Sequence, residues 1–317
     1  MKRYTIEFLS PCIAVLLSKT NLGILFDTSS PDFVNVYFVD SGGSAKDGQI
    51  LMEEAGKICK EKFNRKIKIQ AIFNTHSHAD HSGGNHFLQE QTNCKVYSTE
   101  KEIAGIQNQS LESSIIWGSY PIPELCTEFY LAENSRVTDV IHPEQEINLG
   151  NLNLKVISLP GHYFDPVGFI VKDKTSETTV LFLGDAIFGR KYMSKNWIPY
   201  IYDIAQFKQA LIKISKIKAD YYLPCHGDLS SEIEAVAELN MLALTETEHA
   251  IVKMLSVPKS EEEILKSVAD INNLNMGVAQ TVLIASTIRS FLTSLYRENK
   301  IEPLVQENRL FWKAKKL

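Results

Sequence analysis

Short apolar runs separated by turn signals fill the first forty residues, a pattern typical of β-strands joined in hairpins. Three of these runs predict strands at residues 13–17, 23–26 and 34–39. Asp40-Ser41-Gly42-Gly43 ends the third run. Apolar residues at the spacing of one helix face follow at Ile50, Leu51, Ala55 and Ile58. The chain therefore begins with a meander that leads into a helix.

Strands and helices alternate through the middle of the chain. Apolar runs predict further strands at residues 69–74, 95–97, 152–159, 167–171, 180–183 and 221–223. Helical spacing predicts helices at residues 85–91 and 204–217. Hairpins followed by interleaved strands and helices indicate a mixed α/β (α+β) fold.

Residues 107–145 lack a sustained hydrophobic period although they contain Trp117, Tyr120 and Tyr130. We interpret them as a long irregular connection with room for a short helix. Connections of this length in compact domains often act as lids or binding loops. The alternative is that their aromatic residues pack as a satellite of the core.

The composition changes to helix-forming residues from Glu232 onward. The tail has the order helix, helix, helix, hairpin, with helices at 261–269 and 278–297 and a turn at Glu307-Asn308. This order is typical of a winged-helix domain. We therefore predict a catalytic domain over residues 1–231 and a small helical, winged-helix-like domain over residues 232–317.

Composition and charge describe an ordinary soluble globular protein, with 44% hydrophobic and 22% charged residues. A net charge of −5 argues against a nucleic-acid-binding surface along the whole chain. The five cysteines are odd in number and isolated, which favours a reducing compartment over a disulfide framework. The apolar run at 13–17 is too short for a signal segment, and no stretch approaches the length of a membrane span. We expect a cytoplasmic protein with no membrane partner.

The segment Thr75–Gly84 concentrates chemistry, because three of the eight histidines lie within six residues beside a carboxylate. His76 and His78 are two positions apart, so extended backbone places them on one face with Cα atoms roughly 6.5 Å apart. A tight turn then brings Asp80 and His81 to a neighbouring position. Imidazole and carboxylate groups are ligands for zinc, and for iron or manganese in related sites.

Three later strands end in further candidate ligands: His162 after Gly161, Asp185 after Gly184, and His226 before Gly227. Each alone is weak, since a lone histidine is more often structural. Their common position at strand ends makes the set informative. Tyr163 and Tyr192 follow two of these positions, and we interpret both as walls of a pocket.

Together these motifs resemble those of the metallo-β-lactamase superfamily over roughly residues 10–230. The resemblance implies an αββα sandwich, two β-sheets packed face to face with helices outside. It also implies that His76, His78 and His162 hold one metal ion, that Asp80, His81 and His226 hold a second, and that Asp185 bridges the two. Asp40-Ser41-Gly42 is similar to the family's Asp-x-Gly turn, which supports the site without a catalytic role.

The resemblance implies a binuclear hydrolase with two Zn²⁺ ions, or with Fe or Mn in their place. A metal-bridging hydroxide would attack an ester, thioester, lactone or phosphodiester, with Asp80 and Asp185 as the catalytic carboxylates. The substrate is expected to be a small molecule. The two-domain plan is similar to glyoxalase-II-like and β-lactamase-like-protein-2 type members.

Two alternatives stay open. The first is a mononuclear iron sulfur dioxygenase, which uses a similar set of ligands but consumes oxygen. The second is a hydrolase whose C-terminal domain binds nucleic acid. Residues 247–317 contain ten Lys or Arg against eight Asp or Glu, and the candidate recognition helix has only Arg289 and Arg297. This balance disfavours a nucleic-acid partner, and we expect the tail to form a homodimer or shape the pocket.

Overall fold

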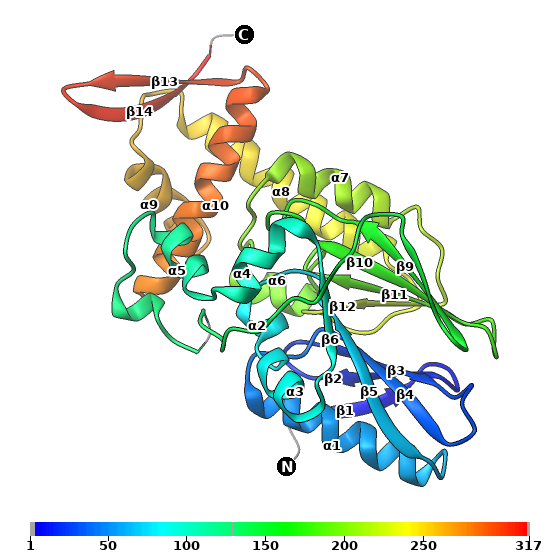
Figure 1. Cartoon of the computed structure of the whole chain (residues 1–317). Coiled ribbons are helices and arrows are strands. Elements are labelled where there is room, and N and C mark those ends of the chain that lie inside the picture. The colour runs from blue at the N-terminus through cyan, green and yellow to red at the C-terminus, as the bar shows by residue number, and fades with distance from the viewer. Residues whose placement is uncertain (1–3, 129, 316–317) are drawn as a thin grey trace.

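Two β-sheets packed face to face form the centre of the protein, as Figure 1 shows. The computed structural model describes residues 4–128 and 130–315. The first sheet has seven strands in the order β1-β2-β3-β4-β5-β6-β7, and the second has five in the order β12-β11-β10-β9-β8. The two predicted domains also include residues 1–3, 129, 316 and 317, which lie outside the described residues.

The first sheet begins as an antiparallel meander and continues with parallel strands. Its strands are β1 (Thr5–Phe8), β2 (Ile13–Leu17), β3 (Leu22–Asp27), β4 (Phe33–Val39), β5 (Lys66–Phe73), β6 (Lys95–Ser98) and β7 (Asp139–Val140). Parallel pairing of β4, β5 and β6 requires crossovers, which α1 (Ala45–Glu61) and α3 (Asn85–Thr92) provide. The carboxyl ends of β4 and β5 therefore meet at one edge, where Asp40 and the His76–His81 segment follow.

The second sheet brings three more strand ends to one edge. Its strands are β8 (Glu146–Leu149), β9 (Leu152–Ser158), β10 (Val167–Asp173), β11 (Thr179–Gly184) and β12 (Tyr221–Pro224). Both β9 and β11 are antiparallel to β10, and β12 is parallel to β11. Consequently β9, β11 and β12 run in the same direction, and His162, Asp185 and His226 follow their carboxyl ends.

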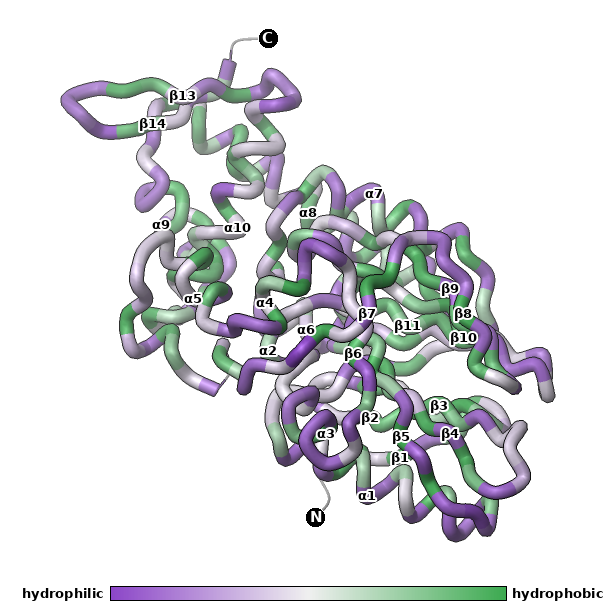
Figure 2. Tube along the Cα trace, viewed as in Figure 1, coloured by the Kyte–Doolittle hydropathy of each residue, from purple (hydrophilic) through white to green (hydrophobic). Residues whose placement is uncertain are grey.

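Three apolar clusters hold the layers together. One lies between the sheets, where the rings of Phe73 and Phe169 meet at 5.9 Å. A second joins the first sheet to α1 and α3 through residues such as Phe38 and Leu51. The third joins the second sheet to α6 (Arg190–Asn196), α7 (Ile204–Ile214) and α8 (Glu234–Met254). This order of layers confirms the predicted αββα sandwich, and Figure 2 shows apolar stretches along its strands.

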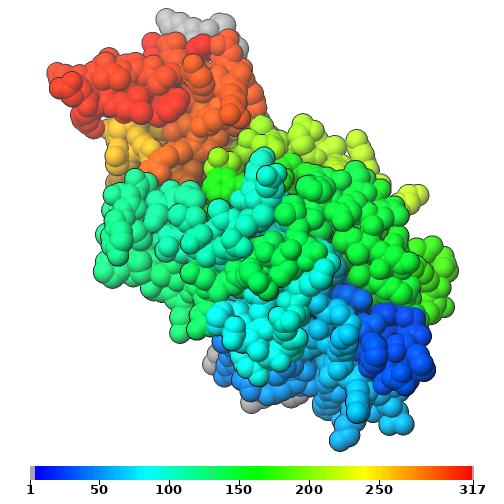
Figure 3. All heavy atoms as spheres, in the orientation of Figure 1, coloured from blue at the N-terminus to red at the C-terminus, as the bar shows by residue number. Residues whose placement is uncertain are grey.

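The tail has the predicted order of three helices and a hairpin. After α8 come α9 (Glu261–Ile271), α10 (Val278–Arg297), β13 (Ile301–Gln306) and β14 (Arg309–Ala314). Glu307 and Asn308 form the hairpin turn with φ of 49° and 58°, the left-handed conformation that two-residue hairpin turns require. Figure 3 shows this C-terminal lobe projecting from the body.

The apolar cluster on the outer face of the second sheet continues into the tail. It contains Leu183 and Phe207 as well as Ile264, Phe291 and Ile301. The division between residues 231 and 232 thus crosses one continuous core, and it stays a prediction.

Helix α10 corrects the expectation that no stretch approaches a membrane span. By length and composition its 20 residues could cross a membrane, although half of its most apolar window is buried in the protein. Ile288, Phe291 and Leu295 of α10 belong to the shared core.

The connection at residues 107–145 is more ordered than the sequence predicts. It follows η1 (Glu100–Glu102) and α4 (Ile103–Gln107), and it contains α5 (Ser110–Trp117) and the short η2 (Pro123–Leu125). Ile116, Leu125 and Tyr130 form a small cluster with Val282 and Leu283 of α10. The aromatic residue Tyr130 is therefore part of a packed satellite of the core. The sequence shows no hydrophobic period here because these helices are only one or two turns long.

Candidate metal centre

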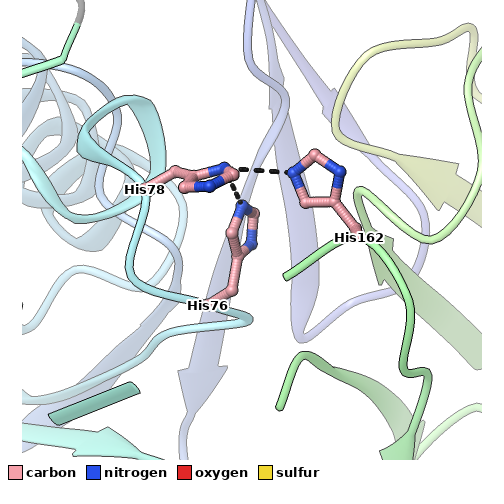
Figure 4. A group of neighbouring side chains, drawn as sticks. All are labelled: His76, His78 and His162. Atoms are coloured by element: carbon pink, nitrogen blue, oxygen red, sulfur yellow. Dashed lines mark hydrogen bonds between the residues drawn. The ribbon is translucent and has the colours of Figure 1, made fainter. Parts of the chain in front are cut away.

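Three histidine side chains converge at the edge where the two sheets meet. His76 and His78 lie on the segment between β5 and the short helix α2 (Ala79–Ser82), and His162 follows β9. The Nδ1 atom of His78 is 3.0 Å from Nε2 of His76 and 3.0 Å from Nε2 of His162. Figure 4 shows the three rings pointing toward one another from separate segments.

A second group of side chains lies beside the first. Nε2 of His226 is 3.1 Å from Oδ2 of Asp80, and Nε2 of His81 is 3.7 Å from Oδ1 of Asp80. Asp185 faces both groups, because its Oδ2 is 3.3 Å from His162 Nε2 and 3.5 Å from His226 Nε2. The structure thus brings together all seven residues that the sequence singled out.

The outer nitrogens of three of these rings have fixed hydrogen-bond partners. Nδ1 of His81 donates to Oδ2 of Asp40 at 2.9 Å. Nδ1 of His162 donates to the carbonyl of Tyr200 at 2.8 Å, and Nδ1 of His226 donates to the carbonyl of Lys19 at 2.9 Å. Carbonyl and carboxylate oxygens only accept, so each Nδ1 carries a proton, and in the neutral ring the Nε2 atom that faces the centre has a free lone pair.

Some of the atoms that face the centre lack a hydrogen-bond partner. Nε2 of His81 and Oδ1 of Asp185 are buried and have no hydrogen-bond partner among the described residues. Bonds of 2.0–2.1 Å to a tetrahedral zinc ion would place ligand atoms about 3.3 Å apart, close to the separations found here. Four sets of at least three donor atoms lie within 4.8 Å of one another. The residues present therefore fit divalent metal ions.

The histidine pKa values differ between the two groups in the metal-free protein. Burial, together with neighbouring histidines, lowers the pKa of His76 and His78 well below the usual value, and burial lowers that of His162 to about 4. These three rings are neutral at pH 7, which is the form that binds metal. Although burial opposes it, Asp185 and Asp80 raise the pKa of His226 to about 9. The second group thus attracts positive charge, which a divalent ion can supply.

Asp40 supports the centre from behind, as its Asp-Ser-Gly turn predicts. It is fully buried with φ of 56°, a left-handed conformation that aspartate tolerates. Besides the proton of His81, its carboxylate accepts hydrogen bonds from Thr75 N and Oγ1, both at 2.8 Å. The thiol of Cys225 also points at Asp40, with Sγ 3.5 Å from Oδ2. Cys225 is thus turned toward this support and His226 toward the centre.

Close packing of the strand ends requires one glycine in particular. Gly184, directly before Asp185, has φ of 54°, and a Cβ atom there would lie 2.9 Å from Cβ of Thr75. Only glycine lets the end of β11 approach Thr75, directly before His76, this closely.

Aromatic rings surround the centre. The ring of Tyr163 lies 4.2 Å from that of His78, and the ring of Tyr192 stacks 5.3 Å from that of His226. Tyr200, which the sequence did not single out, lies 6.0 Å from His162. A further histidine, His86, is on the protein surface, where its Nδ1 lies 3.0 Å from the carbonyl oxygen of Asn134.

Sequence reasoning also missed three buried polar side chains around the His76–His81 segment. Glu102, Gln109 and Glu112 are each at most 8% exposed. The Glu112 carboxylate is 3.9 Å from His78 Nε2, and its pKa is raised well above the usual value by burial and then by Asp80. Glu102 and Glu112 lie in short helices and Gln109 directly precedes α5, so no readable hydrophobic period marked them in the sequence.

Comparisons with known proteins show which family and which relatives this chain is similar to. The profile of the metallo-beta-lactamase superfamily matches residues 30–226. A mitochondrial hydroxyacylglutathione hydrolase of Saccharomyces cerevisiae is 33% identical over 137 residues, which cover 43% of this chain and 39% of that enzyme. A probable metallo-hydrolase of Methanocaldococcus jannaschii is 24% identical over 60% of this chain and 82% of its own length. This chain thus matches only about two-fifths of the yeast enzyme.

Solved structures share the whole fold. A beta-lactamase domain protein from Burkholderia ambifaria superposes with a TM-score of 0.74 at 14% identity, covering 98% of this chain and 93% of that one. A metallo-beta-lactamase family protein from Thermus thermophilus has a TM-score of 0.64 at 15% identity and covers 99% of both chains. Because the superfamily profile spans well over half of the sequence, the chain belongs to the metallo-beta-lactamase superfamily.

Proposed function

We propose that this metallo-hydrolase holds two zinc ions and cleaves a small ester or thioester. The single observation that carries the proposal is the position of Asp185 between two groups of donor atoms, within 3.5 Å of His81, His162 and His226. His76, His78 and His162 would hold one ion, and Asp80, His81 and His226 the other. A site with this composition suits zinc better than magnesium or calcium, because most of its donors are imidazole nitrogens.

Bound divalent ions would supply hydroxide at neutral pH by lowering the pKa of water to about 7. The protein contributes fixed donors. Asp40 and the carbonyls of Tyr200 and Lys19 hold three rings in one tautomer, which keeps their lone pairs aimed at the centre. Asp80 and Asp185 contribute negative charge, because, although burial opposes it, nearby histidines lower the pKa of both.

Substrate would approach from the side of Asp80 and His226. Their side chains are 25% and 13% exposed, whereas that of His81 is fully buried and that of Asp185 is 6% exposed. Tyr192 stacks on His226 at this opening, so its ring would contact the acyl group. The named activity of the hydroxyacylglutathione hydrolases supports a thioester as the first substrate to test.

A substrate panel tests this proposal. Zinc-loaded protein is assayed with a hydroxyacyl thioester of glutathione, a simple ester, a lactone and a phosphodiester, while oxygen uptake is recorded with the iron-loaded protein. Turnover of the thioester or ester without oxygen uptake supports the proposal. Turnover of the phosphodiester alone would contradict the substrate class, and oxygen uptake with a persulfide would indicate the sulfur dioxygenase.

A further inference from the structure

We propose that Glu102 is a positioning residue that joins the two loops of the three-histidine group. This inference rests on the proposed metal site and adds a residue outside it. Glu102 lies at the end of η1 with its side chain fully buried. Buried carboxylates require hydrogen-bond partners, and those of Glu102 come from both loops.

One carboxylate oxygen binds the loop from the first sheet. Oε2 accepts hydrogen bonds from Ser77 N at 3.0 Å and from Ser77 Oγ at 2.6 Å. Ser77 stands between His76 and His78, so these bonds fix the backbone that aims both rings.

The other oxygen binds the loop from the second sheet. Oε1 accepts a hydrogen bond from Asp165 N at 2.7 Å. Asp165 follows His162 by three residues, and its carbonyl also accepts from Thr99 Oγ1 at 2.9 Å. A single side chain thus connects the segments that present all three histidines, although those segments come from different sheets.

Packing around Ser77 supports the same role. A Cβ atom at Gly105 would lie 2.4 Å from Ser77 Oγ, so α4 presses directly on this residue. Gln109 Nε2 donates to Ser82 Oγ at 2.8 Å, and Ser82 Oγ donates to the carbonyl of Ser77 at 3.2 Å. Ser77 is therefore held on several sides, and Glu102 links it to the His162 loop.

The substitution Glu102→Gln tests the proposal. An amide has one acceptor oxygen, so it cannot serve Ser77 and Asp165 together and places an NH₂ group against one of their N–H donors. Glu100→Gln is the matched control, because Glu100 lies in the same short helix, is exposed and loses the same charge. Ser77→Ala, which removes only the hydroxyl bond, is the milder second variant.

Zinc affinities of the metal-free proteins are measured by competition with a chromophoric chelator, together with thermal unfolding. We expect Glu102→Gln to weaken one of two zinc ions by at least about 10-fold, and Ser77→Ala to weaken the same ion less. In an Asp80→Ala background, which retains the three-histidine group, the remaining ion should show the same loss. Affinities for both ions equal to those of Glu100→Gln would overturn the inference, even if the unfolding temperature fell.

Two further outcomes separate this inference from the proposed function. Wild-type protein that binds no zinc would overturn the proposed function and this inference with it. If Glu102→Gln does not fold, Ser77→Ala decides, and wild-type zinc affinity in that variant would overturn the role of Glu102 alone.

Discussion

Asp185 reaches the candidate centre from the end of β11, with Oδ1 3.4 Å from His81 and Oδ2 3.3 Å from His162. Because Oδ2 also lies 3.5 Å from His226, the carboxylate faces both groups of ligands. Asparagine has nearly the same shape but no charge, and only one of its terminal atoms can bind a metal ion. The residue at position 185 therefore decides whether the two groups of ligands form one binuclear site or two separate metal sites.

The substitution Asp185→Asn should therefore reduce the metal content from two ions toward one. It should also lower the rate of hydrolysis by at least about 100-fold, since the loss of a residue that only supports a metal ligand already costs about 10–100-fold in metal affinity or activity. Metal analysis and steady-state kinetics measure the two effects. Asp32→Asn, at an exposed position, is the control. Two ions and full turnover in Asp185→Asn would show that Asp185 does not bridge.

Asp40 accepts a hydrogen bond from His81 Nδ1. In Asp40→Asn the amide no longer selects that tautomer, so Nε2 presents its lone pair less often. We expect about 10-fold to 100-fold weaker binding of the ion held by Asp80, His81 and His226. Chelator competition measures this, and an unchanged affinity would contradict a supporting role for the turn.

At the scale of elements, Asp173 ends β10 and joins it to the β1–β2 connection. It is buried and accepts hydrogen bonds from Ser10 Oγ at 2.6 Å, Cys12 N at 3.1 Å and Thr175 Oγ1 at 2.7 Å. Because β10 is antiparallel to β9 and β11, this end lies at the edge opposite the metal centre. Asp173 therefore connects the two sheets without contributing to the chemistry.

Asp173→Asn should lower the free energy of unfolding by about 1–3 kcal/mol at pH 7 and leave metal content unchanged. Although burial opposes it, hydrogen bonds from Ser10 and Thr175 lower the pKa of Asp173 in the folded protein. A lowered folded pKa contributes stability above the unfolded value of about 3.9, and the contribution is lost as pH falls through the folded value. The difference between wild type and variant should thus shrink below about pH 4 in urea unfolding. A difference that grows on acidification would refute this assignment.

The elements that could be predicted from the sequence are those with a long, clean hydrophobic period. Strands β2 to β4 and helix α10 appear at or within a residue of their expected bounds. Helix α7 ends at Ile214, three residues before the predicted end at Ile217. The prediction was too long because Ile217 packs on the core from the segment after the helix and so continues the apolar spacing. Strand β8 and helix α6 were not anticipated, since β8 has only four residues and α6 is short and mostly polar.

The metal-binding residues could likewise be predicted from the sequence, whereas the buried residues around them could not. The seven candidate ligands were predictable because histidine and aspartate recur at strand ends in a fixed order. Glu102 and Glu112 were not, because a buried glutamate has no signature in the sequence until its partners, such as Ser77, are placed in space.

At the scale of the whole molecule, the tail resembles a nucleic-acid module in its order of elements but not in its charges. Arg289 pairs with Glu261 at 2.8 Å, and Arg297 pairs with Asp203 at 3.5 Å. With both guanidinium groups of α10 beside carboxylates, little positive charge is available for phosphates. We predict no salt-dependent binding of DNA or RNA at physiological ionic strength in a gel-shift titration. Binding that weakens steeply with salt would contradict this.

We propose that one chain holds two metal ions between its two sheets. Mass spectrometric metal analysis of protein purified without added metal tests it most directly, with Asp185→Asn measured in parallel. The geometry predicts about two zinc ions per wild-type chain. A single iron ion, or no metal at all, would contradict the binuclear site.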